Sequence, residues 1–129
     1  MIQSICAIAL GATFGALLRW LISMGLNPLL PQLPLGTLAV NWIGSLFMGL
    51  ALAIFANWPD LGNQWKLMLV TGFLGSLTTF STFSAEMAAM INNGRLWTCA
   101  LAITLHVAGS IIMIFAGLWL FGQARHLMK

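Results

Sequence analysis

Charged side chains are scarce in this chain. Its 129 residues include two acidic and five basic residues, 5% of the sequence, whereas hydrophobic residues make up 60%. A soluble domain carries about 25% charged residues, so these few charges could not give a soluble fold a polar surface. We therefore predict one integral membrane domain covering residues 1–129 and embedded in a lipid bilayer.

Clusters of basic residues, metal ligands and catalytic groups are also missing. The scattered basic residues give a net charge of +3 and are assigned to anchoring at the membrane surface, so no nucleic-acid partner is expected. Cys6 and Cys99 lack a Cys or His at metal-ligand spacing, and we interpret both as small buried residues without a disulfide. Without a nucleophile–base pair or a metal cluster, we expect neither an enzyme nor an organic cofactor.

Long apolar runs make up most of what is present. A membrane-spanning helix needs roughly 20 mostly apolar residues, and four segments reach that length. They predict an all-α membrane protein with four transmembrane helices, at about 4–24, 35–56, 65–91 and 96–121. Pro28, Pro31 and Pro34 separate the first two helices, and Asn92 to Gly94 suit the end of the third.

Small residues at every fourth position predict faces of close helix packing. They are Ala7, Gly11 and Gly15 in the first helix, and Ser45, Gly49 and Ala53 in the second. This pattern is common in membrane helices, so it indicates tight contacts without indicating a partner.

The basic residues give only a weak orientation signal. With four spans, Lys66, Arg125 and Lys129 lie on one side of the membrane, against Arg95 and at most Arg19 on the other. A bias of this size is compatible with insertion in both orientations. It is equally compatible with poor statistics in a charge-poor chain, and the count leaves both open.

The third apolar segment contains an unusual run of hydroxyl groups, TGFLGSLTTFSTFSAE, from Thr71 to Glu86. A buried polar group without a partner costs roughly 2–7 kcal/mol, so these hydroxyls must face protein, one another or water. Phe80 and Phe83 alternate with them, and the positive edges of their rings could stabilise an anion. The segment is therefore predicted to line a path for a small polar species, without a fixed charge that would hold it.

A helix break is predicted within this segment, between Gly75 and Thr79. Gly72 and Gly75 weaken the helix, and Thr78 and Thr79 are stiff and compete for backbone hydrogen bonds. Backbone groups freed inside a bilayer need partners, so a break predicts a bound ion. The alternative is an unbroken helix whose hydroxyls bond to carbonyls four residues earlier, and spacing alone leaves it open.

Four more polar residues lie within the predicted spans. Asn41 offers amide donors or an interhelical hydrogen bond, and His106 and Ser110 share one face because they are four positions apart. His106 is either a packing residue or a functional group. Glu86, the one carboxylate inside a span, is either a proton carrier or a paired residue.

The segment from Thr71 to Glu86 resembles the fluoride channel family called CrcB or Fluc. Its core, G-x-x-T-T-F-S-T-F-S, runs here from Gly75 to Ser84. Arg19 in the first span, Asn41 in VNWIGS and Ser110 in the fourth span also match. The resemblance covers the whole chain, including its length and its layout of four spans.

The resemblance implies passive fluoride export through two pores of an antiparallel dual-topology homodimer in a bacterial inner membrane. It implies a broken third helix in which the backbone carbonyls of Gly75 and Thr78 bind a structural sodium ion at the dimer interface. Arg19, Glu86 and His106 are candidates for either a pathway or a structural role. The implied fluoride pathway consists of Asn41, Thr79, Phe80, Ser81, Thr82, Phe83, Ser84 and Ser110.

Two other functions suit a small four-span chain. A dual-topology, proton-coupled multidrug exporter needs a membrane-embedded carboxylate early in the chain, but the first span has none and Glu86 lies late. A non-transporting assembly subunit needs only the packing motifs, and it would leave the hydroxyl–phenylalanine segment without a role.

Overall fold

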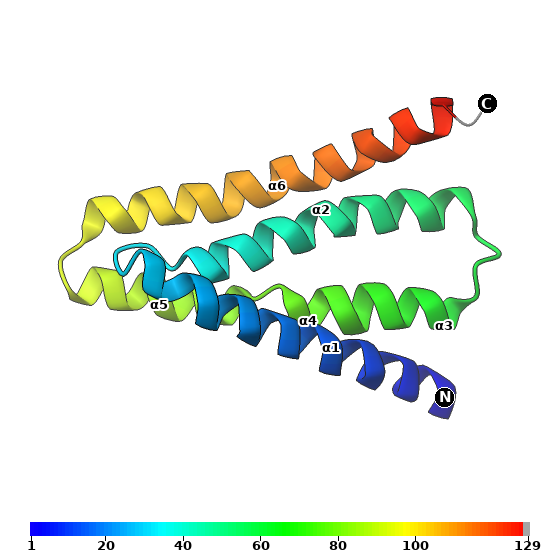
Figure 1. Cartoon of the computed structure of the whole chain (residues 1–129), viewed down its shortest axis with the longest axis horizontal. Helices are drawn as coiled ribbons and strands as arrows, with labels where there is room; N and C mark the ends of the chain where they lie inside the picture. Colours follow the sequence, from blue (N-terminus) through cyan, green and yellow to red (C-terminus); the bar gives the residue numbers. More distant parts are fainter. Residues whose placement is uncertain (128–129) are drawn as a thin grey trace.

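Four long apolar helices lie side by side in the computed structural model, which describes residues 1–127 (Figure 1). They are α1 (Ile2–Leu26), α2 (Leu35–Asn57), an interrupted third segment over Asn63–Asn92, and α6 (Leu96–Leu127). Each is long and apolar enough to cross a bilayer, so the chain is a multi-pass membrane protein with four candidate spans. The amino terminus and the end of α6 lie at the same end of the molecule (Figure 1).

The third segment is assembled from four short pieces. It consists of α3 (Asn63–Lys66), the π-helical η2 (Leu67–Leu74), α4 (Gly75–Leu77) and α5 (Phe80–Asn92). Thr78 and Thr79 are extended, with ψ angles of 154° and 118°, and the helix begins again at Phe80. The predicted break is therefore confirmed and the unbroken helix is wrong. The π-helical turn before it was not anticipated by the sequence.

Proline and glycine end α1 and α5 at the edge of the molecule that is opposite to the chain termini (Figure 1). A short 3-10 helix, η1 (Asn27–Leu29), follows α1 and has a proline in its first turn. After α5, Gly94 has a φ of 72°, a left-handed conformation that residues with a β-carbon rarely adopt. The predicted end of the third span is thus confirmed.

Small residues bring the helix backbones into direct contact, as predicted. A β-carbon on Gly11 would collide with the carbonyl oxygen of Met68, and one on Gly49 with that of Ile114. Close approach without side chains in between is the usual way that membrane helices associate. It fixes α1 against η2 and α2 against α6.

The two cysteines differ, which corrects one expectation. Cys99 is buried and its thiol approaches the carbonyl oxygen of Met87 at 3.8 Å. Cys6 is exposed on the surface of the single chain, so its interpretation as a buried residue is wrong. The difference arises because Cys6 lies on the outer side of α1, next to the inward-facing Ala7.

Candidate functional site

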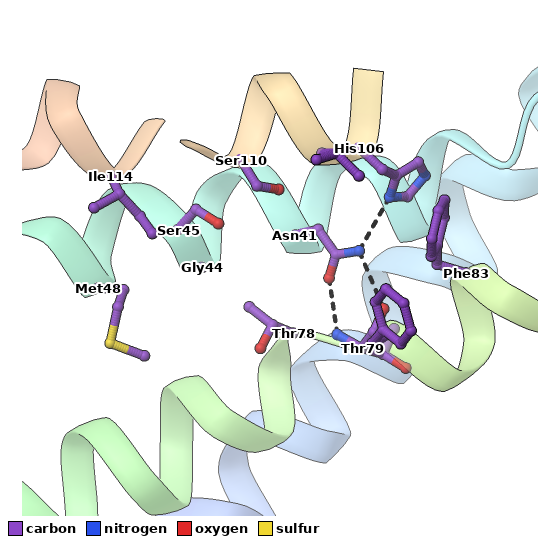
Figure 2. Close-up of a pocket in the computed structure, with 12 residues that line it drawn as sticks. Asn41, Gly44, Ser45, Met48, Thr78, Thr79, Phe83, His106, Ser110 and Ile114 are labelled. Atoms are coloured by element: carbon purple, nitrogen blue, oxygen red, sulfur yellow. Dashed lines mark hydrogen bonds between the residues drawn. The ribbon is translucent and has the colours of Figure 1, made fainter. Parts of the chain in front are cut away.

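A cavity of about 330 Å³ opens beside the break in the third segment, between α2, α5 and α6 (Figure 2). Helix α2 supplies Asn41 and Ser45, the break supplies Thr78 and Thr79, and α6 supplies His106 and Ser110. Phe80 and Phe83 complete the wall from the start of α5. The cavity thus brings together five of the eight predicted pathway residues, from three separate segments of the chain.

Asn41 lies at the centre of this site and holds the break in place. Its Oδ1 accepts a hydrogen bond from the Thr79 backbone N–H at 2.8 Å, and its Nδ2 donates to the Thr79 carbonyl at 3.1 Å. The same Nδ2 lies 3.1 Å from Nδ1 of His106 (Figure 2). Because Asn41 donates here, Nδ1 of His106 must accept, and a neutral imidazole then carries its proton on Nε2.

The buried Nε2 of His106 has no hydrogen-bond partner among the described residues. An unpaired donor in a buried position is costly, so Nε2 is a polar group that the described residues leave unsatisfied. The His106 ring also stacks obliquely on Phe83, with centroids 4.6 Å apart.

The two phenylalanines differ in exposure. Phe83 is buried, whereas Phe80 is 76% exposed on the surface of the single chain. Their ring centroids are 5.4 Å apart and the planes are inclined at 52°, so the two rings lie next to each other along α5. Both rings contribute to the cavity wall, but most of the Phe80 ring is left without a cover on the single chain.

The break also releases backbone carbonyls from their helical partners. In a continuous helix the Gly75 carbonyl accepts from the Thr79 N–H and the Thr78 carbonyl from the Thr82 N–H. Here the Thr79 N–H donates to Asn41 and the Thr82 N–H donates to Oγ1 of Thr79 at 3.1 Å. The carbonyls of Gly75 and Thr78 therefore lose their usual donors at the break.

The remaining hydroxyls of α5 do not reach the cavity. Oγ1 of Thr79 donates to Oγ1 of Thr82 at 2.9 Å and lies 3.4 Å from Oγ of Ser81. Ser81 and Ser84 are exposed on the single chain. They form a row along the outer side of α5, continuous with the exposed ring of Phe80.

Comparison with known proteins identifies the family. Residues 6–118 match the family model described as CrcB-like protein, Camphor Resistance (CrcB). The chain belongs to the CrcB-like family. A protein of Chromohalobacter salexigens named fluoride-specific ion channel FluC is 52% identical over 124 residues, which cover 96% of this chain and 94% of the relative. A protein of the same name from Pseudomonas paraeruginosa is 50% identical over 127 residues, covering 95% of this chain and 100% of the relative.

Glu86 of this CrcB-like chain lies away from the cavity, toward the end of α5. Its Oε1 accepts a hydrogen bond of 2.6 Å from the hydroxyl of Thr37, which is fully buried at the start of α2. Its Oε2 is buried without a partner in the described part of the chain. Sequence reasoning did not select Thr37, and the one available signal was a hydroxyl inside an apolar span.

Arg19 of this CrcB-like chain contacts the break from the side of α1. Its Nε donates to the carbonyl of Ser76 at 2.9 Å, replacing the donor that the break removes. The Ser76 hydroxyl in turn donates to the Ala12 carbonyl at 3.0 Å. Arg19 is therefore engaged with backbone next to the cavity, and it does not line the cavity itself.

Proposed function

We propose that this chain is a fluoride-selective ion channel, not an enzyme, through which fluoride leaves the cytoplasm passively. The main support is the cavity beside the helix break, which combines hydroxyl, amide and imidazole groups with two phenyl rings and has no Lys, Arg, Asp or Glu in its wall. The relatives whose printed names state this activity match over nearly their full length.

The composition of the wall suits a small anion that must cross quickly. Fluoride is strongly hydrated, so its lost water must be replaced by donors and positive ring edges. A fixed cation in a site of low dielectric would bind it too tightly to release it. A membrane potential that is negative inside drives an anion outward with about 2.3 kcal/mol per 100 mV.

The pathway in our proposal follows the predicted residues in two stretches. Within the cavity, Ser110 supplies a hydroxyl donor, Asn41 and Thr79 hold the wall in place through their mutual hydrogen bonds, and Phe80 and Phe83 form the transfer point. Beyond it, Ser81, Thr82 and Ser84 continue toward the end of α5. Glu86 with Thr37 would mark the outer end of this row, and His106 would contribute by holding Asn41 through Nδ1.

A second subunit would cover the exposed row. Phe80 is 76% exposed, and Ser81, Ser84 and Gly75 are also exposed on the single chain. Hydrocarbon does not satisfy hydroxyl groups, so this surface is suited to protein. With the weak charge bias, this supports an antiparallel homodimer with two pores, inserted in both orientations in a bacterial inner membrane.

A structural sodium ion would fit at the break. The Gly75 and Thr78 carbonyls have lost their helical donors, and freed carbonyls of interrupted membrane helices are known to coordinate sodium. The ion would neutralise these dipoles where the two subunits meet. Purified dimer kept in sodium-free buffer is expected to retain about one sodium per dimer by elemental analysis. Complete loss with unchanged stability would contradict this assignment.

Fluoride efflux from liposomes tests the function. Potassium fluoride-loaded liposomes containing the protein should release fluoride when valinomycin is added, while potassium chloride-loaded liposomes should retain chloride. Phe80→Ile and Phe83→Ile should each abolish efflux and leave the oligomeric state unchanged. Phe14→Ile is the matched control, because Phe14 is 65% exposed on α1 and away from the cavity.

Two results would reject this function. Normal efflux in both Phe variants would remove the rings from the pathway. Proton-dependent uptake of a cationic dye, without fluoride efflux, would favour the multidrug exporter. The arrangement of Glu86 disfavours that alternative, since its carboxylate is bonded to Thr37 and lies outside the cavity.

A further inference from the structure

A second cavity, here called the terminal cavity, lies at the end of the molecule where α1 begins and α6 ends. It has a volume of about 660 Å³ and is bounded by the carboxyl-terminal halves of α2 and α6, which diverge toward this end (Figure 1). Between this cavity and the one at the break, the two helix backbones touch. A β-carbon on Gly49 would collide with the carbonyl oxygen of Ile114, and one on Gly117 with that of Leu46. The terminal cavity is therefore a separate site.

The wall of the terminal cavity changes from apolar to polar along its length. Leu52 and Leu118 line its inner part, and Asn57, Arg125 and His126 line its rim near the helix ends. Leu118 and Arg125 are seven residues apart on α6, which corresponds to about two turns and a rise of about 10 Å. A wall of this kind suits an occupant that is apolar at one end and polar at the other.

Exposed tryptophans place the rim at the level of lipid headgroups. Trp97 and Trp119 are both exposed on α6, and a separation of 22 residues gives a rise of about 33 Å between them. This matches the hydrocarbon core of a bilayer, which is about 30 Å thick and has tryptophan at both boundaries. Arg125 lies about 9 Å beyond Trp119, in the headgroup layer, and Leu118 lies at the edge of the hydrocarbon.

The rim offers positive charge to a ligand. Arg125 is exposed, and one of its guanidinium nitrogens donates to Oδ1 of Asn57. A guanidinium has five N–H donors, so others remain, and their planar arrangement suits the oxygens of a phosphate group. The two acidic residues of the chain, Asp60 and Glu86, lie outside the cavity wall. The rim therefore favours an anionic group.

The same groups distinguish among phospholipids. A zwitterionic headgroup would bring an ammonium for which the wall has no carboxylate, and the Asn57 oxygen already accepts from Arg125. A headgroup with hydroxyls in place of the ammonium leaves no charge unpaired, and a hydroxyl can bond to the His126 imidazole. A free phosphate ion would leave the apolar inner part of the cavity uncovered, whereas an acyl chain would fill it.

We propose that the terminal cavity binds one anionic phospholipid. Its phosphate lies on Arg125, its hydroxyl-bearing headgroup lies toward His126, and the start of an acyl chain lies between Leu52 and Leu118. The lipid holds the ends of α2 and α6 together where the protein leaves a gap, and it stabilises the fold because it binds only the folded chain. The site is separate from the proposed fluoride pathway, so the two are tested independently.

Native mass spectrometry tests the site, because it counts the lipids that remain bound after the detergent is removed. Phosphatidylglycerol and phosphatidylcholine with the same acyl chains are added separately to the purified protein in neutral detergent. We expect one phosphatidylglycerol per chain, and binding of phosphatidylcholine that is weaker by about 5-fold or more. Phosphatidylglycerol should also raise the melting temperature more than phosphatidylcholine does.

Matched variants separate a built site from general attraction to the membrane surface. Arg125→Gln should weaken phosphatidylglycerol binding about 5- to 10-fold, whereas Lys66→Gln, which removes a charge at the same end but outside the wall, should not. Gly122→Leu fills the cavity, and a β-carbon there meets nothing within 4 Å, so it should block binding without disturbing the fold. Gly25→Leu is its control, because Gly25 is equally open but lies outside the wall.

The remaining outcomes overturn the proposal. Phosphatidylglycerol binding that survives both Arg125→Gln and Gly122→Leu would place the lipid elsewhere, and equal binding of the two lipids would remove the headgroup preference. An equal loss in Arg125→Gln and Lys66→Gln would leave only surface attraction. Displacement of the lipid by inorganic phosphate would assign Arg125 to a free anion, and a changed oligomeric state in Gly122→Leu would assign the cavity to a second subunit.

Discussion

Asn41 allows the sharpest test of how the break is held. It joins α2 to the break through two bonds with the backbone of Thr79, of 2.8 and 3.1 Å, and it joins α2 to α6 through His106 at 3.1 Å. Asn41→Ala removes all three contacts at once. It leaves the Thr79 N–H in a buried position with no helical carbonyl in reach, because the chain there is extended.

The size of the effect follows from these contacts. Interhelical hydrogen bonds in membranes contribute about 0.6 kcal/mol on average, so three give about 2 kcal/mol. A buried donor left without a partner adds about 1–3 kcal/mol. We therefore expect Asn41→Ala to lower the free energy of unfolding by roughly 3–5 kcal/mol. Fluoride efflux should also fall, because Thr79 and His106 lose their common support.

Reversible unfolding in bicelles measures this loss. Asn57→Ala is the matched control on the same helix: the Asn57 amide donates to the Ala53 carbonyl within α2, its oxygen accepts a hydrogen bond from Arg125 of α6, and the side chain is exposed. Its substitution should cost less than about 1 kcal/mol, because these bonds are open to solvent. If Asn41→Ala unfolds with the same free energy as Asn57→Ala, the conclusion that Asn41 stabilises the break is wrong.

Two further predictions concern packing and the buried carboxylate. Gly11→Ala should destabilise the fold by about 1–3 kcal/mol, because the added methyl group would meet the η2 backbone. Gly25→Ala is the control and should leave the stability unchanged, because Gly25 has open space around it. Equal melting temperatures of the two variants would contradict the close contact between Gly11 and η2. Thr37→Val should lower the free energy of unfolding by about 1–3 kcal/mol, because Glu86 would keep a buried oxygen without its donor. Thr13→Val, which removes only an exposed bond within α1, is its control in the same denaturation assay, and an equal loss in both variants would reject a special role for the buried pair.

The family motif and the structure each account for a different part of the site. The motif from Gly75 to Ser84 selected the aromatic pair and the hydroxyls, and residue spacing placed His106 and Ser110 on one face. The structure places both on the cavity wall. Spacing could not show that Phe83 is buried while Phe80 is exposed, since that depends on which neighbours cover each side of α5.

The sequence by itself determined the membrane class, the four apolar helices and the family. Composition and run length suffice for the first two, because a bilayer requires about 20 apolar residues per span and tolerates few charges. The sequence also marked the glycines and threonines at which the third helix breaks, although it could not exclude an unbroken one.

Only the tertiary structure decided how that break is satisfied. The Thr79 N–H bonds to Asn41, which is 38 residues away, and the Ser76 carbonyl bonds to Arg19, which is 57 residues away. Thr37 finds Glu86 across 49 residues in the same way. Periodicity reports which side chains share a face of one helix, but these partners come from different helices. Their distances are fixed by how closely the small residues let the helices approach.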